Sequence, residues 1–160
     1  MRFTILIIFF LHLSVAVFAQ AFKQEPAIDF KLPTSKGDSI SLSQFRGKVV
    51  LLDFWASWCG PCRVANKHLV KIYPNYRGKN IVFLSVSLDE KPSDWLSAVK
   101  KDKLSWLQLI DQKAWNSPVA AAWDVNSIPA TFLIDQEGNV IARNLMGTAL
   151  ESGINKLLNQ

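Results

Sequence analysis

Two cysteines standing three positions apart, Cys59 and Cys62, are the residues of this chain best suited to covalent chemistry. A disulfide between them would close a loop with only Gly60 and Pro61 inside it. Such a bond removes little entropy from the unfolded chain, because the loop-closure term grows with loop length. The spacing therefore favours redox exchange, with a purely structural disulfide as the alternative.

The cysteine pair lies where a buried strand is expected to run into a helix. Residues Lys48–Trp55 are nearly all apolar, as in a strand buried on both faces of a sheet, and apolar residues recur at helical spacing after Pro61. Unpaired N–H groups and the dipole at a helix start favour a thiolate, so we expect Cys59 to be the more exposed sulfur and the nucleophile. Cys62, one turn further, is expected to point inward and to resolve the mixed disulfide.

The two residues between the cysteines suit this position. Gly60 permits a tight turn and a close approach of substrate. Pro61 falls in the first helical turn, where its missing N–H costs little.

Two other cysteine chemistries are disfavoured by the neighbouring residues. A zinc site needs four ligands, and after the apolar N-terminal run only His68 could add a nitrogen to the two sulfurs. Haem attachment requires a histidine directly after the second cysteine, and that position is Arg63. We therefore predict no metal and no cofactor.

The first residues of the chain match an export signal. Arg2 precedes an apolar run, Phe3–Ala19, that ends in small residues, and this is the three-part secretory pattern. We expect residues 1–19 to be a signal peptide that is cut after Ala19 or Ala21. The alternative is an uncleaved membrane anchor, since about 17 apolar residues is the lower limit for a span. The protein is thus predicted to be periplasmic or otherwise extracytoplasmic, and membrane-bound only if the segment is uncleaved.

The rest of the chain fits one domain, at residues 26–160. The formal net charge is +5, but the basic residues are scattered. A nucleic-acid partner would need a basic stripe or patch, so we predict none.

Strand and helix patterns alternate along this domain. Besides Lys48–Trp55, we expect strands at Ile28–Leu32, Ser39–Leu42, Ile81–Leu88, Leu104–Ile110, Ala130–Ile134 and Val140–Arg143. Helices are expected from Pro61 to about Pro74, from Pro92 to Lys101, from Ser117 to Trp123 and at Ala149–Leu158. This order predicts an α/β domain whose mixed central sheet is flanked by helices and preceded by an N-terminal β-hairpin.

Two segments carry a resemblance to a known family. Asp53–Cys62 (DFWASWCGPC) is similar to the active-site strand and helix of the thioredoxin family. Ser127–Asp135 (SIPATFLID) is similar to the segment where that family has a cis-proline before a strand. The export signal, the hairpin and the Leu88–Gln112 segment resemble the TlpA/ResA-like branch of exported thioredoxin-like proteins. The resemblance covers nearly all of the mature chain and implies a thioredoxin-like fold with thiol-disulfide oxidoreductase activity.

The resemblance also implies roles around the cysteines. Pro129 would have the cis peptide bond and face the pair, and Ile128 would offer its backbone groups to an extended substrate peptide. Trp58 would shelter the sulfurs and pack on substrate, whereas Trp55 is more typical of the core.

Acidic residues are the last group that the resemblance singles out. Asp53 would be a buried acid that assists proton transfer behind the second cysteine, with its pKa raised by burial. The alternative is an edge position from which its carboxylate reaches water. Asp89 or Glu90 matches a second, accessory acid of this branch, unless these residues only cap the following helix.

Four functions remain open. We favour a reductase of protein disulfides, because the Gly-Pro pair matches thioredoxin, which is strongly reducing. An external electron donor, in the membrane, would re-reduce a monomeric enzyme, and apocytochromes in cytochrome c maturation would be among its substrates. The alternatives are a disulfide oxidant or isomerase, a peroxidase like the peroxiredoxins that share the hairpin, and a non-catalytic binding module.

Overall fold

The computed structural model of the chain describes residues 25–160. The predicted signal peptide at residues 1–19, with cleavage after Ala19 or Ala21, lies outside the described residues. Within the described part, no helix combines the length and the apolar character that crossing a membrane requires.

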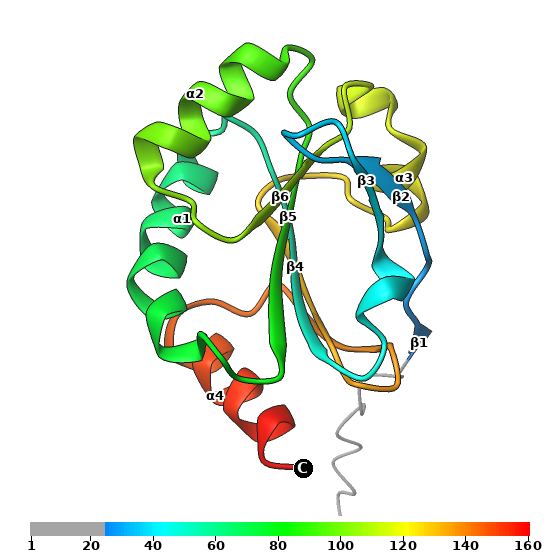
Figure 1. Cartoon of the computed structure of the whole chain (residues 1–160), viewed down its shortest axis with the longest axis vertical. Coiled ribbons are helices and arrows are strands. Elements are labelled where there is room, and N and C mark those ends of the chain that lie inside the picture. Colours follow the sequence, from blue (N-terminus) through cyan, green and yellow to red (C-terminus); the bar gives the residue numbers. More distant parts are fainter. Residues whose placement is uncertain (1–24) are drawn as a thin grey trace, which may run out of the picture.

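A six-stranded mixed sheet forms the centre of the molecule (Figure 1). Its strands are β1 (Glu25–Pro26), β4 (Val49–Trp55), β5 (Ile81–Ser87), β6 (Leu107–Ile110), β7 (Ala130–Ile134) and β8 (Asn139–Arg143). In the order β1-β8-β7-β4-β5-β6, the strands β4, β5 and β6 are parallel, and β7, β8 and β1 pair antiparallel. Every residue of β4 is buried, as its apolar run predicts. The predicted mixed α/β sheet is therefore confirmed.

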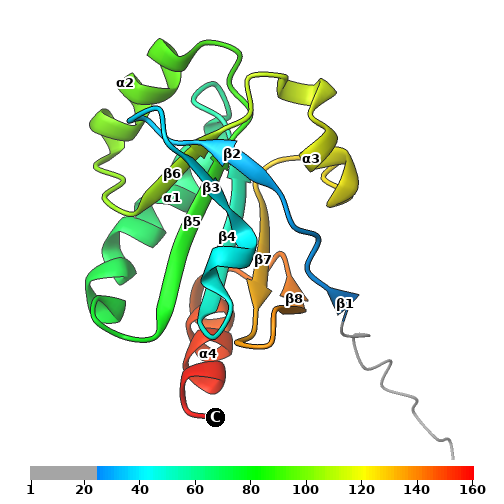
Figure 2. The ribbon, with the colours of Figure 1, turned by 45° about the vertical axis from the view of Figure 1, so that its right-hand side comes forward.

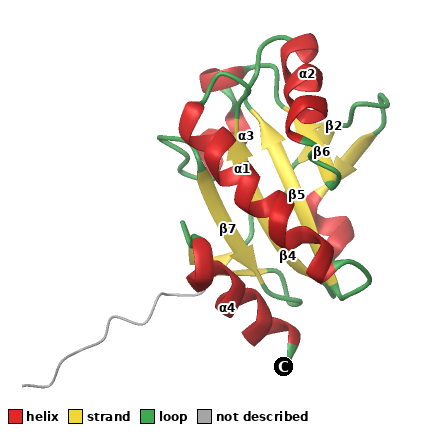
Figure 3. Ribbon diagram, turned by 90° about the vertical axis from the view of Figure 1, so that its left-hand side faces the viewer, coloured by secondary structure: helices red, strands yellow, loops and turns green. Residues whose placement is uncertain are grey.

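Two layers cover the faces of the sheet. On one face lie α1 (Gly60–Ile72), α2 (Pro92–Asp102) and α4 (Gly147–Leu158), as Figure 3 shows. On the other face lie α3 (Pro118–Ala122) and the predicted hairpin, formed by β2 (Lys31–Pro33) and β3 (Ser39–Ser41) (Figure 2). Three short 3-10 helices connect these elements: η1 (Leu42–Phe45), η2 (Tyr73–Tyr76) and η3 (Ala114–Asn116).

Side chains of β4 alternate between the two layers. Leu51 and Trp55 pack under α1, α2 and α4, whereas Leu52 and Phe54 pack under the hairpin and α3. Because successive strand residues point to opposite faces, Asp53 shares the face of Leu51 and Trp55. The one charged residue of this strand is thus directed toward the layer that contains the cysteine-bearing helix.

Some predicted details are wrong. No strand was predicted at Glu25–Pro26, but these residues pair with β8, a contact that only the folded chain creates. Strand β6 begins at Leu107 rather than Leu104. Val64 is one of the apolar residues that recur at helical spacing after Pro61 and were expected to share a buried face, yet it is 66% exposed. Five residues separate it from Leu69, which places the two about 140° apart around a helix.

Candidate active site

Cys59 and Cys62 form a disulfide at the N-terminal end of α1. Cys59 is the N-cap residue, and its Sγ accepts a hydrogen bond from the backbone N–H of Cys62 at 3.1 Å. Cys62 is fully buried, whereas Cys59 is 6% exposed. The more accessible sulfur therefore lies where N–H groups and the helix dipole favour negative charge.

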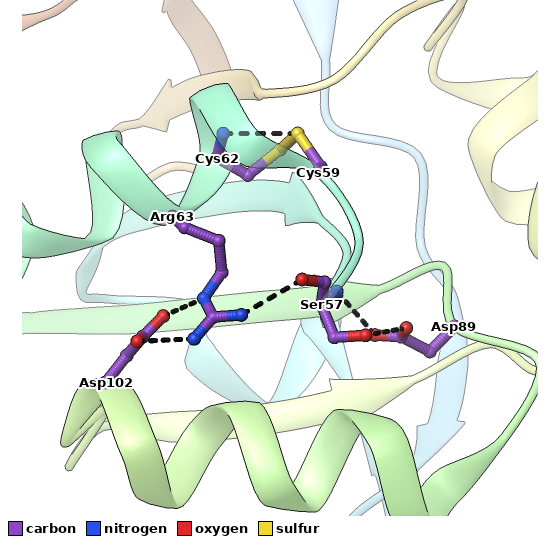
Figure 4. Close-up of polar contacts among 6 residues, drawn as sticks. All are labelled: Ser57, Cys59, Cys62, Arg63, Asp89 and Asp102. Carbon is purple, nitrogen blue, oxygen red and sulfur yellow. Dashed lines mark hydrogen bonds and ion pairs between the residues drawn. A yellow bond between two sulfur atoms is a disulfide. The ribbon is translucent and has the colours of Figure 1, made fainter.

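The loop that leads into Cys59 is held by a buried carboxylate, Asp89, which follows β5 (Figure 4). Its oxygens accept hydrogen bonds from the backbone N–H of Ser57 at 2.9 Å and from the Ser57 hydroxyl at 2.6 Å. The Ser87 hydroxyl donates to it as well, at 2.6 Å. Asp89 is only 2% exposed, and hydrogen-bonded partners of this kind are what make a buried carboxylate tolerable. Asp89 thus fixes the backbone two residues before Cys59.

Arg63 holds the same loop from its other side (Figure 4). Its guanidinium forms a two-pronged ion pair with Asp102 at the end of α2, with one contact, Nη2 to Oδ1, at 2.6 Å. Its remaining Nη1 donates to the carbonyl oxygen of Ser57 at 3.0 Å. The hydrogen bond to Asp102 raises the pKa of Arg63 above its ordinary value. A permanent cation therefore ties α1, α2 and the active-site loop together.

Asp53 lies in the centre of the sheet, between Ser85 of β5 and Thr131 of β7. It is 4% exposed, so the alternative of an edge position that reaches water is wrong. The Ser85 hydroxyl donates to its carboxyl group and itself accepts from Trp106 Nε1 at 2.7 Å. Burial raises the pKa of Asp53 to about 7, and the hydrogen bond from Ser85 opposes this shift only in part.

A cavity of about 280 Å³ joins this acid to the buried cysteine, since both Asp53 and Cys62 line it. Its further lining comes from α1, the cis-proline loop, β7, α4 and the segment between β8 and α4, and includes Asn66, His68, Pro129, Thr131, Leu145 and Met146. Asn66 is 1% exposed, and among the described residues its Nδ2 has no hydrogen-bond partner. A proton released by Cys62 thus has a basic group, the Asp53 carboxylate, on the wall of the same cavity.

The cis-proline loop lies against the disulfide. The Ile128–Pro129 peptide bond is cis, as the resemblance implied. The carbonyl oxygen of Ile128 lies 3.7 Å from Sγ of Cys59, and Pro129 lines the cavity that Cys62 reaches. An extended peptide that placed its sulfur on Cys59 would therefore meet the Ile128 carbonyl oxygen beside it.

The surface around Cys59 is open. Trp58 is 56% exposed, Gly60 and Pro61 are exposed, and a Cβ added at Gly60 would meet no described atom within 4 Å apart from its chain neighbours and the nearby backbone of its own helix. Trp55, in contrast, is fully buried, as expected for a core residue.

The two acids after β5 differ in environment. Asp89 is buried and fully engaged, whereas Glu90 is exposed. The N-cap of α2 is Lys91, and no side chain caps this helix. The alternative that Asp89 or Glu90 caps α2 is therefore wrong.

Over residues 25–160, no cluster of three or more His, Cys, Asp and Glu side chains is arranged as metal ligands would be. His68 Nε2 instead lies 3.6 Å from a carboxylate oxygen of Glu151.

Comparisons with known proteins place the chain in a family. The family model described as "AhpC/TSA family" matches residues 24–143. The chain belongs to the AhpC/TSA family. Over 165 aligned residues it is 29% identical to the thiol-disulfide oxidoreductase ResA of Geobacillus kaustophilus, covering 99% of this chain and 92% of that protein.

Solved structures place this AhpC/TSA member among thioredoxin-like proteins. The thioredoxin domain of a thiol-disulfide oxidoreductase from Bacteroides vulgatus is similar to it with a TM-score of 0.79 and 33% identity, over 84% of this chain and 96% of that chain. A thiol-disulfide oxidoreductase from Bacteroides fragilis has a TM-score of 0.79 and 37% identity, over 84% and 100%. The chain is therefore a thiol-disulfide oxidoreductase with a thioredoxin-like fold, as the resemblance implied.

Several residues of this AhpC/TSA site escaped the sequence analysis. Ser57, Asn66 and the role of Arg63 were missed, and Asp102 was not considered. Asp89, by contrast, was named from the sequence. An acid directly after a buried strand needs hydrogen-bond donors around it, and this is a signal that the sequence does contain.

Proposed function

We propose that the protein is an exported reductase of protein disulfides that works by dithiol-disulfide exchange. The observation that carries this proposal is the Cys59–Cys62 disulfide at the start of α1, with the more accessible sulfur on Cys59. In the reduced enzyme, the Cys59 thiolate attacks one sulfur of a substrate disulfide. A mixed disulfide forms, and the other substrate sulfur leaves as a thiolate that takes a proton from water.

Cys62 completes the exchange. Its thiol loses a proton, its sulfur attacks Sγ of Cys59, and the second substrate sulfur is released and protonated. The substrate has then gained two electrons and two protons, and the enzyme holds the disulfide. An external donor, in the membrane in this proposal, returns two electrons to the pair, and one proton from the donor or from water restores the Cys62 thiol while Cys59 stays a thiolate.

Asp53 is the proposed proton acceptor for Cys62. A carboxyl group with an ordinary pKa near 3.8 would be too weak a base, whereas burial brings Asp53 to about 7. The shared cavity supports a proton transfer between the two groups. Glu90, which is exposed and directly follows Asp89, is the proposed accessory acid.

Substrate is proposed to bind as an extended peptide across the cis-proline loop. The Ile128 carbonyl accepts a backbone N–H of the peptide, and Pro129 fixes the loop at that point. Trp58, Gly60 and Pro61 provide the open surface on the other side of Cys59.

The setting of this activity follows from the N-terminal sequence. In this proposal residues 1–19 are a signal peptide, residues 26–160 are one thioredoxin-like domain, and the enzyme works as a periplasmic or otherwise extracytoplasmic monomer. Disulfide-containing proteins are its partners, and apocytochromes before haem attachment are one such class, as the resemblance to the TlpA/ResA-like branch implies. The proposal includes no nucleic acid and no metal.

The equilibrium potential tests the direction of the exchange. A reductase with Gly-Pro between its cysteines is expected near the thioredoxin value of about −270 mV. Equilibration of the mature protein with glutathione redox buffers, read out by alkylation of free thiols and mass spectrometry, gives this potential. A value above about −180 mV, in the isomerase and oxidase range, would contradict reduction and support the oxidant alternative.

A further inference from the structure

Two exposed tryptophans stand side by side next to the nucleophile. Trp58, directly before Cys59, is 56% exposed, and Trp115 is 51% exposed. Their ring centroids lie 6.2 Å apart with the planes tilted by 51°. Water contact with two large aromatic surfaces is unfavourable, and exposed apolar groups gathered in one place mark interaction sites more often than single ones do.

Trp115 is held at the surface by a rigid turn. Asp111 accepts hydrogen bonds from the Ser117 hydroxyl at 2.5 Å and from the backbone N–H of Lys113 at 3.1 Å. Between them, Ala114 has a φ of 51°, a left-handed conformation that costs energy for a residue with a Cβ. Backbone bonds from Ala114 to Asp111 and from Ser117 to Ala114 close the turn. The strained residue Ala114 is thus held in place by these hydrogen bonds, and the exposed Trp115 follows it directly in the same turn.

The two tryptophans line a hollow together with three acidic residues. The hollow has a volume of about 310 Å³ and is lined by Trp58, Asp89, Glu90, Lys91, Asp94, Ala114 and Trp115. Three carboxylates and one lysine give it a formal charge of −2 at neutral pH, in a chain whose net charge is +5. Gln112 Nε2 donates to the Glu90 carbonyl at 3.4 Å and so links the segment after β5 to the turn that contains Trp115.

We propose that this hollow binds a lysine or arginine side chain that lies within a few residues of the cysteine under attack. The inference rests on the proposed function and names the substrate class of that same site: protein segments with a basic residue flanking the disulfide. A cation over the face of a tryptophan is attracted by the ring quadrupole. The exposed carboxylates of Glu90 and Asp94 supply charge-assisted hydrogen bonds to the same group. An acidic or a neutral side chain would have neither the attraction to the rings nor the charge-assisted hydrogen bonds.

Peptide mixed disulfides test this preference. Short peptides with one central cysteine, bonded to 2-mercaptoethanol, differ only in carrying Lys, Gln or Glu at one flanking position, which is scanned on both sides. Reaction of the reduced protein with each peptide is followed by stopped-flow tryptophan fluorescence. At the optimal position the Lys peptide is expected to react about fivefold faster than the Gln peptide, and the Glu peptide more slowly than both. The ratio should fall at about 0.5 M salt, because exposed charges are screened.

Two variants locate the preference. In Trp115→Ala and in Asp94→Asn, the ratio of the Lys rate to the Glu rate is expected to fall toward one, whereas Asp124→Asn, an exposed acid outside the hollow, should keep the wild-type ratio. All rates are normalised to the rate of the same variant with the neutral bis(2-hydroxyethyl) disulfide. Equal Lys and Glu rates in the wild type, or an unchanged ratio in both hollow variants, would overturn the inference alone. Failure of the reduced wild type to react with any of these disulfides would overturn the proposed function and the inference with it.

Discussion

Replacing Cys59 with serine is expected to abolish the reduction of insulin disulfides, with a loss on the order of a thousandfold or more. A serine hydroxyl is not ionised near neutral pH and forms no disulfide, so the group that opens the substrate bond is lost. Cys62 cannot take over, because it is fully buried. Precipitation of the free insulin B chain, with a chemical reductant as electron donor, measures the rate.

A matched control separates this effect from a folding defect. Asp124→Asn changes an exposed residue and should reduce insulin at the wild-type rate. Thermal unfolding followed by circular dichroism shows whether Cys59→Ser remains folded. A folded Cys59→Ser variant with wild-type activity would contradict the assigned nucleophile.

Asp53→Asn is expected to slow turnover by about a hundredfold, the lower end of what a positioned acid or base contributes. In the proposed mechanism the carboxylate accepts the proton of Cys62, so the wild-type rate should rise with pH through about 7, where Asp53 ionises. An amide cannot accept that proton, and the inflection should disappear. Turnover rates measured over a series of pH values test this, and an inflection near 7 that persists in Asp53→Asn would contradict the role of Asp53.

Asp53→Asn is expected to lower activity but to raise the free energy of unfolding at neutral and alkaline pH. The pKa of Asp53 is raised by folding from 3.8 to about 7, so the native state binds the proton more tightly than the unfolded chain does. Its contribution to stability is therefore fully present below pH 3.8 and is lost as the pH rises through about 7, by roughly 4 kcal/mol in total. Asp53→Asn lacks this loss and should be the more stable protein above pH 7.

Urea unfolding at acidic and alkaline pH measures that difference. The exposed Asp124→Asn should follow the wild type at each pH, because its carboxylate is already in water. The same dependence of unfolding free energy on pH in the wild type and in Asp53→Asn would show that burial of this carboxyl costs nothing.

The elements of the fold were predictable where local patterns decide them. Val49–Trp55 and Ala130–Ile134 are nearly continuous apolar runs, and both became central strands. Ser117-Pro118 has the pattern of a helix start, and the Ser117 hydroxyl indeed accepts from the N–H of Ala120. The two-residue strand Glu25–Pro26 carries no pattern of its own, because its pairing with β8 depends on the finished sheet.

The site was predictable where a short motif contains its residues. The sulfurs, the cis-proline and the buried acid were all located from two segments. Arg63 and Asp102, in contrast, are separated by 39 positions and meet only because α1 and α2 pack on the same face of the sheet. Trp115 was not singled out from the sequence, since its place at the surface depends on the hydrogen bonds of Asp111.

Trapping the covalent intermediate tests most directly whether Cys59 captures the substrate and Cys62 releases it. Reduced mature protein carrying Cys62→Ala is mixed with an oxidised protein substrate, quenched by alkylation, and mapped by mass spectrometry. A stable adduct joined through Cys59 is expected to accumulate, whereas the wild type treated in the same way should show almost none. If the variant forms no adduct, or releases its substrate as fast as the wild type, then the assignment of Cys59 as the nucleophile and Cys62 as the resolving thiol is wrong.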